Sequence, residues 1–199
     1  MSGVVIDKLI NEISKLPGLG RKSAQRIALY LLKNRENGLV PFIKSIEEAN
    51  SKIINCEICG NIDTISPCGI CQNPKRDQDK ICIVEDVSDL WVFERIGFYR
   101  GMYLVLGGTL SAIDDIGIDE LNINELSKRI KKQNIKEVIL ALSTTMEGQT
   151  TSHVIADKLE SLDNLEVTRL AEGVPIGGEV HYLDENTLNA AYQSRKKIV

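Results

Sequence analysis

The sequence predicts a multi-domain α/β protein in which a helical N-terminal part and a four-cysteine segment precede a parallel α/β domain and a C-terminal strand-helix tail. Three observations predict this order. Apolar residues recur at helical spacing through the first fifty residues. Four cysteines then fall within residues 56–71. After residue 80, short runs rich in Val, Ile and Leu alternate with helical stretches, which is typical of parallel strands joined by crossover helices.

The bulk composition is that of a globular protein. Of the 199 residues, 43% are hydrophobic and 26% are charged, so a sizeable core can form. No apolar run is long enough to span a bilayer, and the N-terminus lacks a signal-peptide pattern. We therefore expect a cytoplasmic protein with no membrane partner. In that reducing compartment, clustered cysteines favour metal binding over disulfides.

The net charge of −4 is unevenly distributed along the chain. Residues 1–55 hold nine Lys/Arg against five acids, a net charge of +4. The remainder holds fifteen against twenty-three, a net charge of −8. This asymmetry favours an anion-binding N-terminal part on an acidic body, and a moderately basic helical surface is the alternative.

Three helices are expected in the N-terminal part. An apolar stripe covers residues 6–16, a second begins near Arg21, and a third covers about 39–54 with Pro41 in its first turn. The string PGLG ends the first helix.

The start of the second helix is a candidate phosphate contact. Glycines let a backbone approach closely, and the free N–H groups of a helix N-terminus favour an anion. Arg21, Lys22 and Arg26 add positive charge there without reading base sequence. The alternatives are an ordinary helical hairpin and a contact between subunits.

The cysteine segment predicts a structural zinc site. Its spacing, C-x2-C-x8-C-x2-C, supplies the four thiolates that tetrahedral zinc prefers and leaves no position for a reacting water. The four cysteines are Cys56, Cys59, Cys68 and Cys71. A redox dithiol and an iron–sulfur cluster are the alternatives. The segment contains no Lys or Arg, which argues against a finger that reads bases and favours a clasp between its neighbours.

The second half of the chain is expected to hold four strands and their connecting helices. A polar connector at 72–80 leads into this half. Strands are predicted at 81–85, 103–106, 137–142 and 165–170, with helices at 86–96, 122–133 and 151–162. Cys82 lies inside the first strand and is expected in the core. The tail predicts a short strand at 179–183 and a helix from about residue 185.

Acidic residues follow two of these strands, at the sheet edge where open α/β folds place their sites. Glu85, Asp86 and Asp89 follow the first strand, and Glu147 follows the strand at 137–142. They could bind Mg²⁺ weakly. Alternatively, they cap helix starts and hydrogen-bond to neighbours.

Several of these motifs resemble known families. Glu85 at a strand end, followed by a helix and a second acidic site, resembles the Toprim fold, although the Asp-x-Asp cluster of Toprim enzymes is missing after Ser143–Thr145. The stretch LPGLGRKSAQRIALYL resembles a helix-hairpin-helix. The chain resembles the RecR family along nearly its whole length. The resemblance depends on four motifs in this order: the LPGLG stretch, the cysteine spacing, ICIVEDVSDLWVFERIGFYRGMYLVLGG and EGVPIGGEVHYLDENTL.

The resemblance implies a division of the chain into 1–54 (helix-hairpin-helix), 55–80 (zinc segment), 81–175 (Toprim) and 176–199 (a segment compared to a Walker B element). It also implies a non-enzymatic recombination mediator at the nucleoid. With RecO and RecF, such proteins help load RecA onto single-stranded DNA coated by single-strand-binding protein. They form dimers and ring-like tetramers around single- or double-stranded DNA.

Two other functions are weighed against the mediator. A Mg²⁺-dependent nuclease or primase-like enzyme would use the four acids. A zinc-containing transcriptional regulator would need a recognition helix rich in Arg, Asn and Gln, which the sequence does not show. No Walker A string is present either, which argues against ATP hydrolysis.

Overall fold

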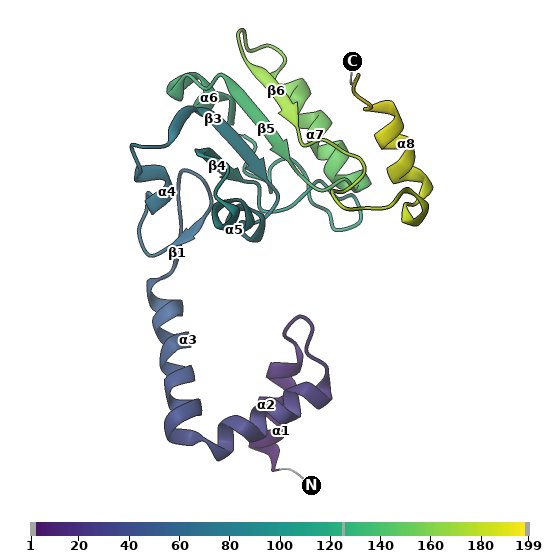
Figure 1. Ribbon diagram of the computed structural model, residues 1–199. Coiled ribbons are helices and arrows are strands. Elements are labelled where there is room, and N and C mark those ends of the chain that lie inside the picture. Colours follow the sequence, from purple (N-terminus) through teal and green to yellow (C-terminus); the bar gives the residue numbers. More distant parts are fainter. Residues whose placement is uncertain (1–2, 125, 198–199) are drawn as a thin grey trace. The chain divides into compact units, whose positions relative to one another are not determined.

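The computed structural model describes residues 3–124 and 126–197 and divides into two compact units, one ending at Ile53 and one beginning at Ile54 (Figure 1). Among the helices of these described residues, none is long and apolar enough to cross a membrane.

The first unit is helical, as predicted. It consists of α1 (Val4–Ser14), α2 (Arg21–Lys33), a short π-helical turn η1 (Arg35–Leu39) and α3 (Val40–Lys52), with Pro41 in the first turn of α3. Helices α1 and α2 pack through Ile10, Ala24 and Ala28, all buried. The two alanines let the helix backbones approach closely, and the turn between the helices contains Gly18 at φ +76°.

The second unit contains the predicted parallel sheet. Its strands are β3 (Asp77–Val84), β4 (Gly101–Val105), β5 (Glu137–Ala141) and β6 (Glu166–Arg169), in the order β4-β3-β5-β6 with every pair parallel. Helices α5 (Val87–Ile96), α6 (Leu126–Gln133) and α7 (Met146–Leu159) connect them. Strand β4, the next in the chain, lies on one side of β3, and β5, which follows it, lies on the other side of β3. The switch point is therefore the carboxyl end of β3.

Alternate residues of β3 enter two different hydrophobic layers. Ile81 and Ile83 pack with buried residues of α6 and α7, whereas Cys82 and Val84 pack with Leu90 of α5. Both faces of the strand are therefore covered, which explains why its second half reads as a continuous apolar run. Burying each such side chain contributes about 1.5–3 kcal/mol. The prediction that Cys82 is a core residue is confirmed.

Most boundaries in the second unit lie within about three residues of the sequence expectation, and the starts of three elements differ by more. Strand β3 begins at Asp77, inside the predicted connector, because polar residues at its start still pair through their backbones, as in the bond from the Asp77 N–H to the Arg100 carbonyl at 2.8 Å. Helix α6 begins at Leu126 rather than 122. Helix α7 begins at Met146 rather than 151, because the Thr145 hydroxyl accepts the Gly148 N–H and caps the helix.

The strand predicted at 179–183 is wrong. Val180–Tyr182 forms a single turn of 3-10 helix, η2, and no strand of the described sheets pairs with it. Its alternating pattern does not produce a strand because these side chains are mostly exposed and there is no buried face for the apolar ones to enter. The final helix, α8 (Glu185–Gln193), begins where predicted, and Asp184 caps it by accepting the N–H groups of Asn186 and Thr187.

Candidate functional site

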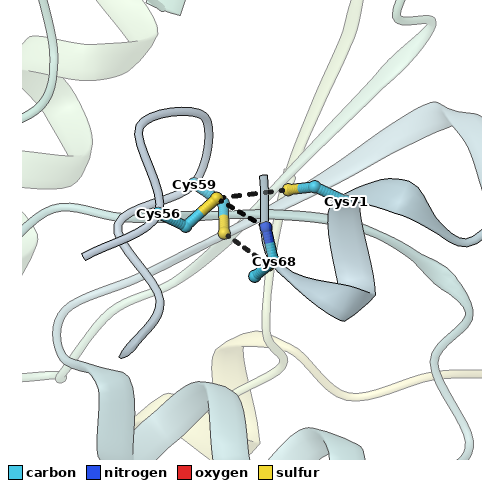
Figure 2. A group of neighbouring side chains, drawn as sticks. All are labelled: Cys56, Cys59, Cys68 and Cys71. Carbon is cyan, nitrogen blue, oxygen red and sulfur yellow. Dashed lines mark hydrogen bonds between the residues drawn. The ribbon is translucent and has the colours of Figure 1, made fainter. Parts of the chain in front are cut away.

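The four cysteines of the segment converge on one point. Strands β1 (Ile54–Asn55) and β2 (Ile62–Asp63) pair antiparallel around the first Cys-x-x-Cys turn, and the short helix α4 (Gly69–Gln72) carries the second. All four Sγ atoms lie within 4.8 Å of one another (Figure 2). The Cys56–Cys71 and Cys59–Cys68 sulfurs are 3.9 and 3.5 Å apart. Tetrahedral zinc with its usual Zn–S bonds spaces sulfurs by about 3.8 Å, so the cluster fits that geometry.

Backbone N–H groups point at two of these sulfurs. The Cys68 N–H donates to Cys56 Sγ at 3.3 Å, and the Asn61 N–H donates to Cys59 Sγ at 3.5 Å. A hydrogen bond with the Cys71 thiol, helped by Asn61, lowers the pKa of Cys59 to about 5 against the opposing effect of burial. Bonds of this kind favour thiolate, the form that binds metal.

The second cysteine turn is held by a carboxylate. Asp63 Oδ2 accepts the Gly69 N–H at 3.0 Å, and Oδ1 accepts the Thr64 N–H at 2.6 Å. These bonds from Gly69 and then Thr64 lower the pKa of Asp63. Asp63 thus supports the fold of the cysteine segment and is not itself among the clustered ligands.

The first cysteine turn docks on the sheet along its edge strand β4. The Val105 N–H donates to the Cys59 carbonyl at 2.8 Å. Glycine is favoured beside it at position 60, because a φ of +76° strains any residue with a Cβ and a Cβ there would also lie only 3.1 Å from the Val105 carbonyl oxygen. The buried Asn61 accepts a hydrogen bond from Trp91 Nε1 on α5 at 3.3 Å. The segment therefore belongs structurally to the sheet.

Arg129 of α6 joins the cysteine segment to the same edge strand. Its Nη1 donates to the carbonyl of Ile58 at 2.9 Å, inside the first cysteine turn, and to the carbonyl of Tyr103 at 2.8 Å, on β4. Its Nε donates to Gln133 at 3.0 Å. Burial lowers the pKa of Arg129, while the negative charge of the cysteine thiolates opposes that shift.

Cys82 is separate from this centre. It lies in the core between β4 and β5, and burial raises its pKa to about 12, so it is held as a neutral thiol. Within the described residues, the four predicted cysteines form the one group in which at least three His, Cys, Asp or Glu side chains could share a metal, so the candidate metal site does not include Cys82.

The predicted phosphate-contacting residues all lie on the exposed surface of the first unit. Arg21 and Lys22 occupy the first turn of α2, and Arg26 follows one turn later. Gly20 stands at the N-cap without a side chain to bond the free N–H groups, and that first turn contains no acid. Two cations beside a positive helix end are mutually unfavourable, and an anion bound there would relieve the repulsion.

The four predicted acids do not come together as one site. Glu85 and Glu147 line a shared cavity of about 500 Å³ at the switch point of the sheet. Asp86 and Asp89 instead form a capping box on α5, in which Asp86 accepts the Ser88 N–H at 2.9 Å and Asp89 accepts the Asp86 N–H at 3.0 Å. For this pair, the helix-capping alternative is confirmed.

Known proteins share these features in the same order. Residues 6–50 match the family model for the RecR helix-hairpin-helix, residues 79–171 match the Toprim domain, and residues 173–196 match the RecR C-terminal region. The recombination protein RecR of Hyphomonas neptunium is 51% identical over 197 residues, covering 99% of this chain and 98% of that protein. Those of Allorhizobium ampelinum and Sinorhizobium medicae are each 50% identical over 198 residues, covering 100% of this chain and 98% of each relative.

The chain belongs to the RecR family. Membership supports a role in recombination and repair, and it confirms the resemblance expected from the motifs. The match of residues 79–171 also confirms the Toprim identity of the sheet domain, although no cluster of three or more carboxylates is found among the residues that the structure describes.

Sequence reasoning missed Arg129 and Asn61. Arg129 stands in the string LSKRIKKQ, where it looks like one of several surface cations. For Asn61, the sequence contains only a weak indication of a structural role. It directly follows Cys-x-x-Cys-Gly, where a polar side chain can hydrogen-bond to groups near the turn. Thr151 was also missed: it is buried, and its hydroxyl accepts the Leu110 N–H at 2.9 Å and donates to the Glu147 carbonyl at 2.7 Å.

The cysteine cluster predicts one zinc ion per chain. Native mass spectrometry should find it in the wild type and in Cys82→Ser, and should not find it in Cys59→Ser, because a serine hydroxyl replaces a thiolate ligand. Chelation should raise the hydrogen-exchange rate of the Val105 amide, which donates a hydrogen bond to the Cys59 carbonyl.

Acidification should weaken zinc binding, since protons compete with zinc for the thiolates. Equal zinc content in wild type and Cys59→Ser would contradict the site.

Proposed function

We propose that this member of the RecR family is a non-enzymatic recombination mediator that binds DNA at gaps. It would act on the nucleoid in the cytoplasm, with RecO and RecF, and help RecA replace single-strand-binding protein on single-stranded DNA. The family supports recombination, and the arrangement of exposed cations at the start of α2 carries the DNA-binding part of the proposal.

The α1–α2 hairpin supplies a sequence-independent phosphate contact. Lys22 and Arg26 lie one helical turn apart, so both project from the same side of α2. The buried Ala24 and Ala28 anchor the helix on α1, which leaves those cations free of the packing interface. Contacts of this kind bind backbone phosphates of single- or double-stranded DNA without selecting bases.

Exposed apolar side chains support assembly of several copies. In the first unit, α3 exposes Val40, Phe42, Ile43 and Ile46. In the second unit, the C-terminal segment exposes Ile176, Tyr182 and Tyr192. Apolar groups gathered in this way favour contact with other protein surfaces. We propose that they serve a homo-oligomer, a dimer that pairs into a tetrameric ring around DNA.

A Toprim enzyme fits the acids less well. Two of the four carboxylates hold the capping box of α5, which leaves Glu85 and Glu147 near the switch point. Asp114 lines the same cavity, where it accepts a hydrogen bond from Ser111 Oγ at 2.8 Å. These acids could bind Mg²⁺ weakly, but among the described residues no three of them lie close enough to share a metal, as two-metal phosphodiester chemistry requires.

Lys22→Ala combined with Arg26→Ala should weaken DNA binding and reduce the slope of log K against log salt by about 1.4–1.8, since each of the two lost phosphate contacts removes about 0.7–0.9. Fluorescence anisotropy across a salt series measures it, and circular dichroism checks that the exposed substitutions leave the fold intact. Lys52→Ala is the matched control, because Lys52 is exposed in the same unit and its ammonium already pairs with Glu48 at 2.6 Å. An unchanged slope in the double variant would remove the proposed contact.

The same variants test mediation. With RecO present, wild type and Lys52→Ala should shorten the delay before RecA becomes active on single-stranded DNA covered by single-strand-binding protein, and the double variant should lose that effect. If the double variant still shortens the delay fully, DNA contact through α2 is not the basis of mediation.

Oligomer assembly is tested by multi-angle light scattering over a range of protein concentrations. We expect masses of two or four chains, with the larger species favoured by a gapped duplex because ring closure and DNA binding stabilise each other. Phe42→Ser should shift the mass downward. A single-chain mass at every concentration, with and without DNA, would rule out the ring.

No Mg²⁺-dependent cleavage of single- or double-stranded DNA is expected, because no three carboxylates of the described residues lie close enough at the switch point to share a metal. Labelled substrates incubated with excess protein and Mg²⁺ measure this. Cleavage by the wild type that disappears in Glu85→Gln would replace the mediator with the enzyme.

A further inference from the structure

Arg129 has an unusual set of hydrogen bonds. Nη1 and Nε use their three N–H groups on the Ile58 carbonyl, the Tyr103 carbonyl and Gln133. The remaining nitrogen, Nη2, is buried and has no hydrogen-bond partner among the described residues. A buried, unpartnered charged donor is costly, so a fold that retains one calls for an explanation.

The cysteine centre poses the complementary problem. A divalent metal with four thiolates carries a net charge of −2, and Cys56, Cys59 and Cys68 are almost wholly buried. Burying such a charge is expensive unless a cation balances it. Residues 56–71 contain no Lys or Arg, and their charged side chains, Glu57 and Asp63, are both acidic. The balancing cation must therefore come from elsewhere in the fold.

Arg129 occupies the required place. The Ile58 carbonyl that it binds lies between Cys56 and Cys59 in the chain, so the guanidinium sits against the first cysteine turn. Cys71 of the second turn packs against the hydrophobic layer that contains Leu126 and Ile130 of the same helix, α6. Negative charge on the cysteines raises the pKa of Arg129, against the larger lowering effect of burial.

We propose that Arg129 is the counter-cation of the four-cysteine metal centre. In the metal-loaded protein, its Nη2 N–H groups donate hydrogen bonds to the cysteine thiolates. The residue thereby couples metal binding to the edge of the sheet, because the same guanidinium holds the carbonyl of Tyr103 on β4. Arg129 is a positioning residue: it acts on the metal through its ligands. The inference rests on metal occupancy of the cysteine centre and is independent of the DNA-binding role.

The test compares zinc retention by Arg129→Met, Arg129→Lys and Arg76→Met in the full chain. Arg76 is the matched control: it is a partly buried arginine of the same unit whose Nε donates to another β4 carbonyl, that of Gly101, at 2.9 Å, while its charge pairs with Glu94 at 2.8 Å. Zinc-loaded protein is titrated with a chromophoric chelator, and the zinc affinity and release rate are recorded. Thermal unfolding is measured with and without zinc.

Arg129→Met should lower zinc affinity about 10- to 100-fold, the range seen when a group supporting metal ligands is lost. Arg129→Lys should recover most of the affinity because it keeps the charge, and Arg76→Met should match the wild type. The gain in unfolding temperature on adding zinc should shrink in Arg129→Met and stay unchanged in Arg76→Met, even though both variants lose a bond to β4.

Three results would overturn the proposal: wild-type zinc affinity in Arg129→Met, an Arg129→Lys variant as weak as Arg129→Met, or equal losses in Arg129→Met and Arg76→Met. The last two would assign Arg129 to holding backbone carbonyls alone. A wild type that binds no zinc would instead refute the metal centre itself, and DNA binding measured in parallel keeps that outcome separate from the proposed function.

Discussion

The second unit depends on how the edge of its parallel sheet is closed. Strand β4 is an edge strand, and an open edge leaves backbone groups ready to pair with another chain. Here the first cysteine turn covers it, through the bond from the Val105 N–H to the Cys59 carbonyl, and Arg129 takes the carbonyl of Tyr103. The cysteine segment is thus part of the sheet's construction. Its four cysteines meet at one point, where a bound metal would add its binding free energy to the stability of the fold.

The N-termini of α5 and α2 show how acidic and basic side chains are used differently in this chain. At α5, the positive helix end is satisfied by the chain's own carboxylates, Asp86 and Asp89, in a capping box. At α2, the cap is Gly20, and the first turn carries Arg21 and Lys22. The first arrangement consumes acids that would otherwise be available to a metal. In the second, the first turn of the helix contains two cations and no acid, and this is the physical basis of the proposed contact with phosphate.

Much of the fold could be predicted from the sequence wherever the spacing of apolar residues matched either a helix or a buried strand clearly. The helices of the first unit and the four strands of the sheet were found because their apolar patterns are long or continuous, as at Ile81–Val84. The errors fall where tertiary context decides. The polar start of β3 pairs through backbone groups that leave no hydrophobic signal, and the alternation around Val180 lacks a sheet to join.

The sequence by itself determined the candidate metal ligands and the charge at the start of α2, because both depend on residue types at short spacing: two Cys-x-x-Cys turns, and a glycine turn followed by Arg21 and Lys22. It also determined family membership, through the order of the motifs. Only the tertiary structure decided which carboxylates are already in use and which cation meets the cysteine turns. Arg129 lies 58 residues beyond Cys71 in a string of similar basic residues, so nothing local distinguishes it. The packing of α6 on the sheet places this guanidinium against the Ile58 carbonyl. Its electrostatic interaction with the cysteines is stronger there than in water, because the dielectric constant is lower.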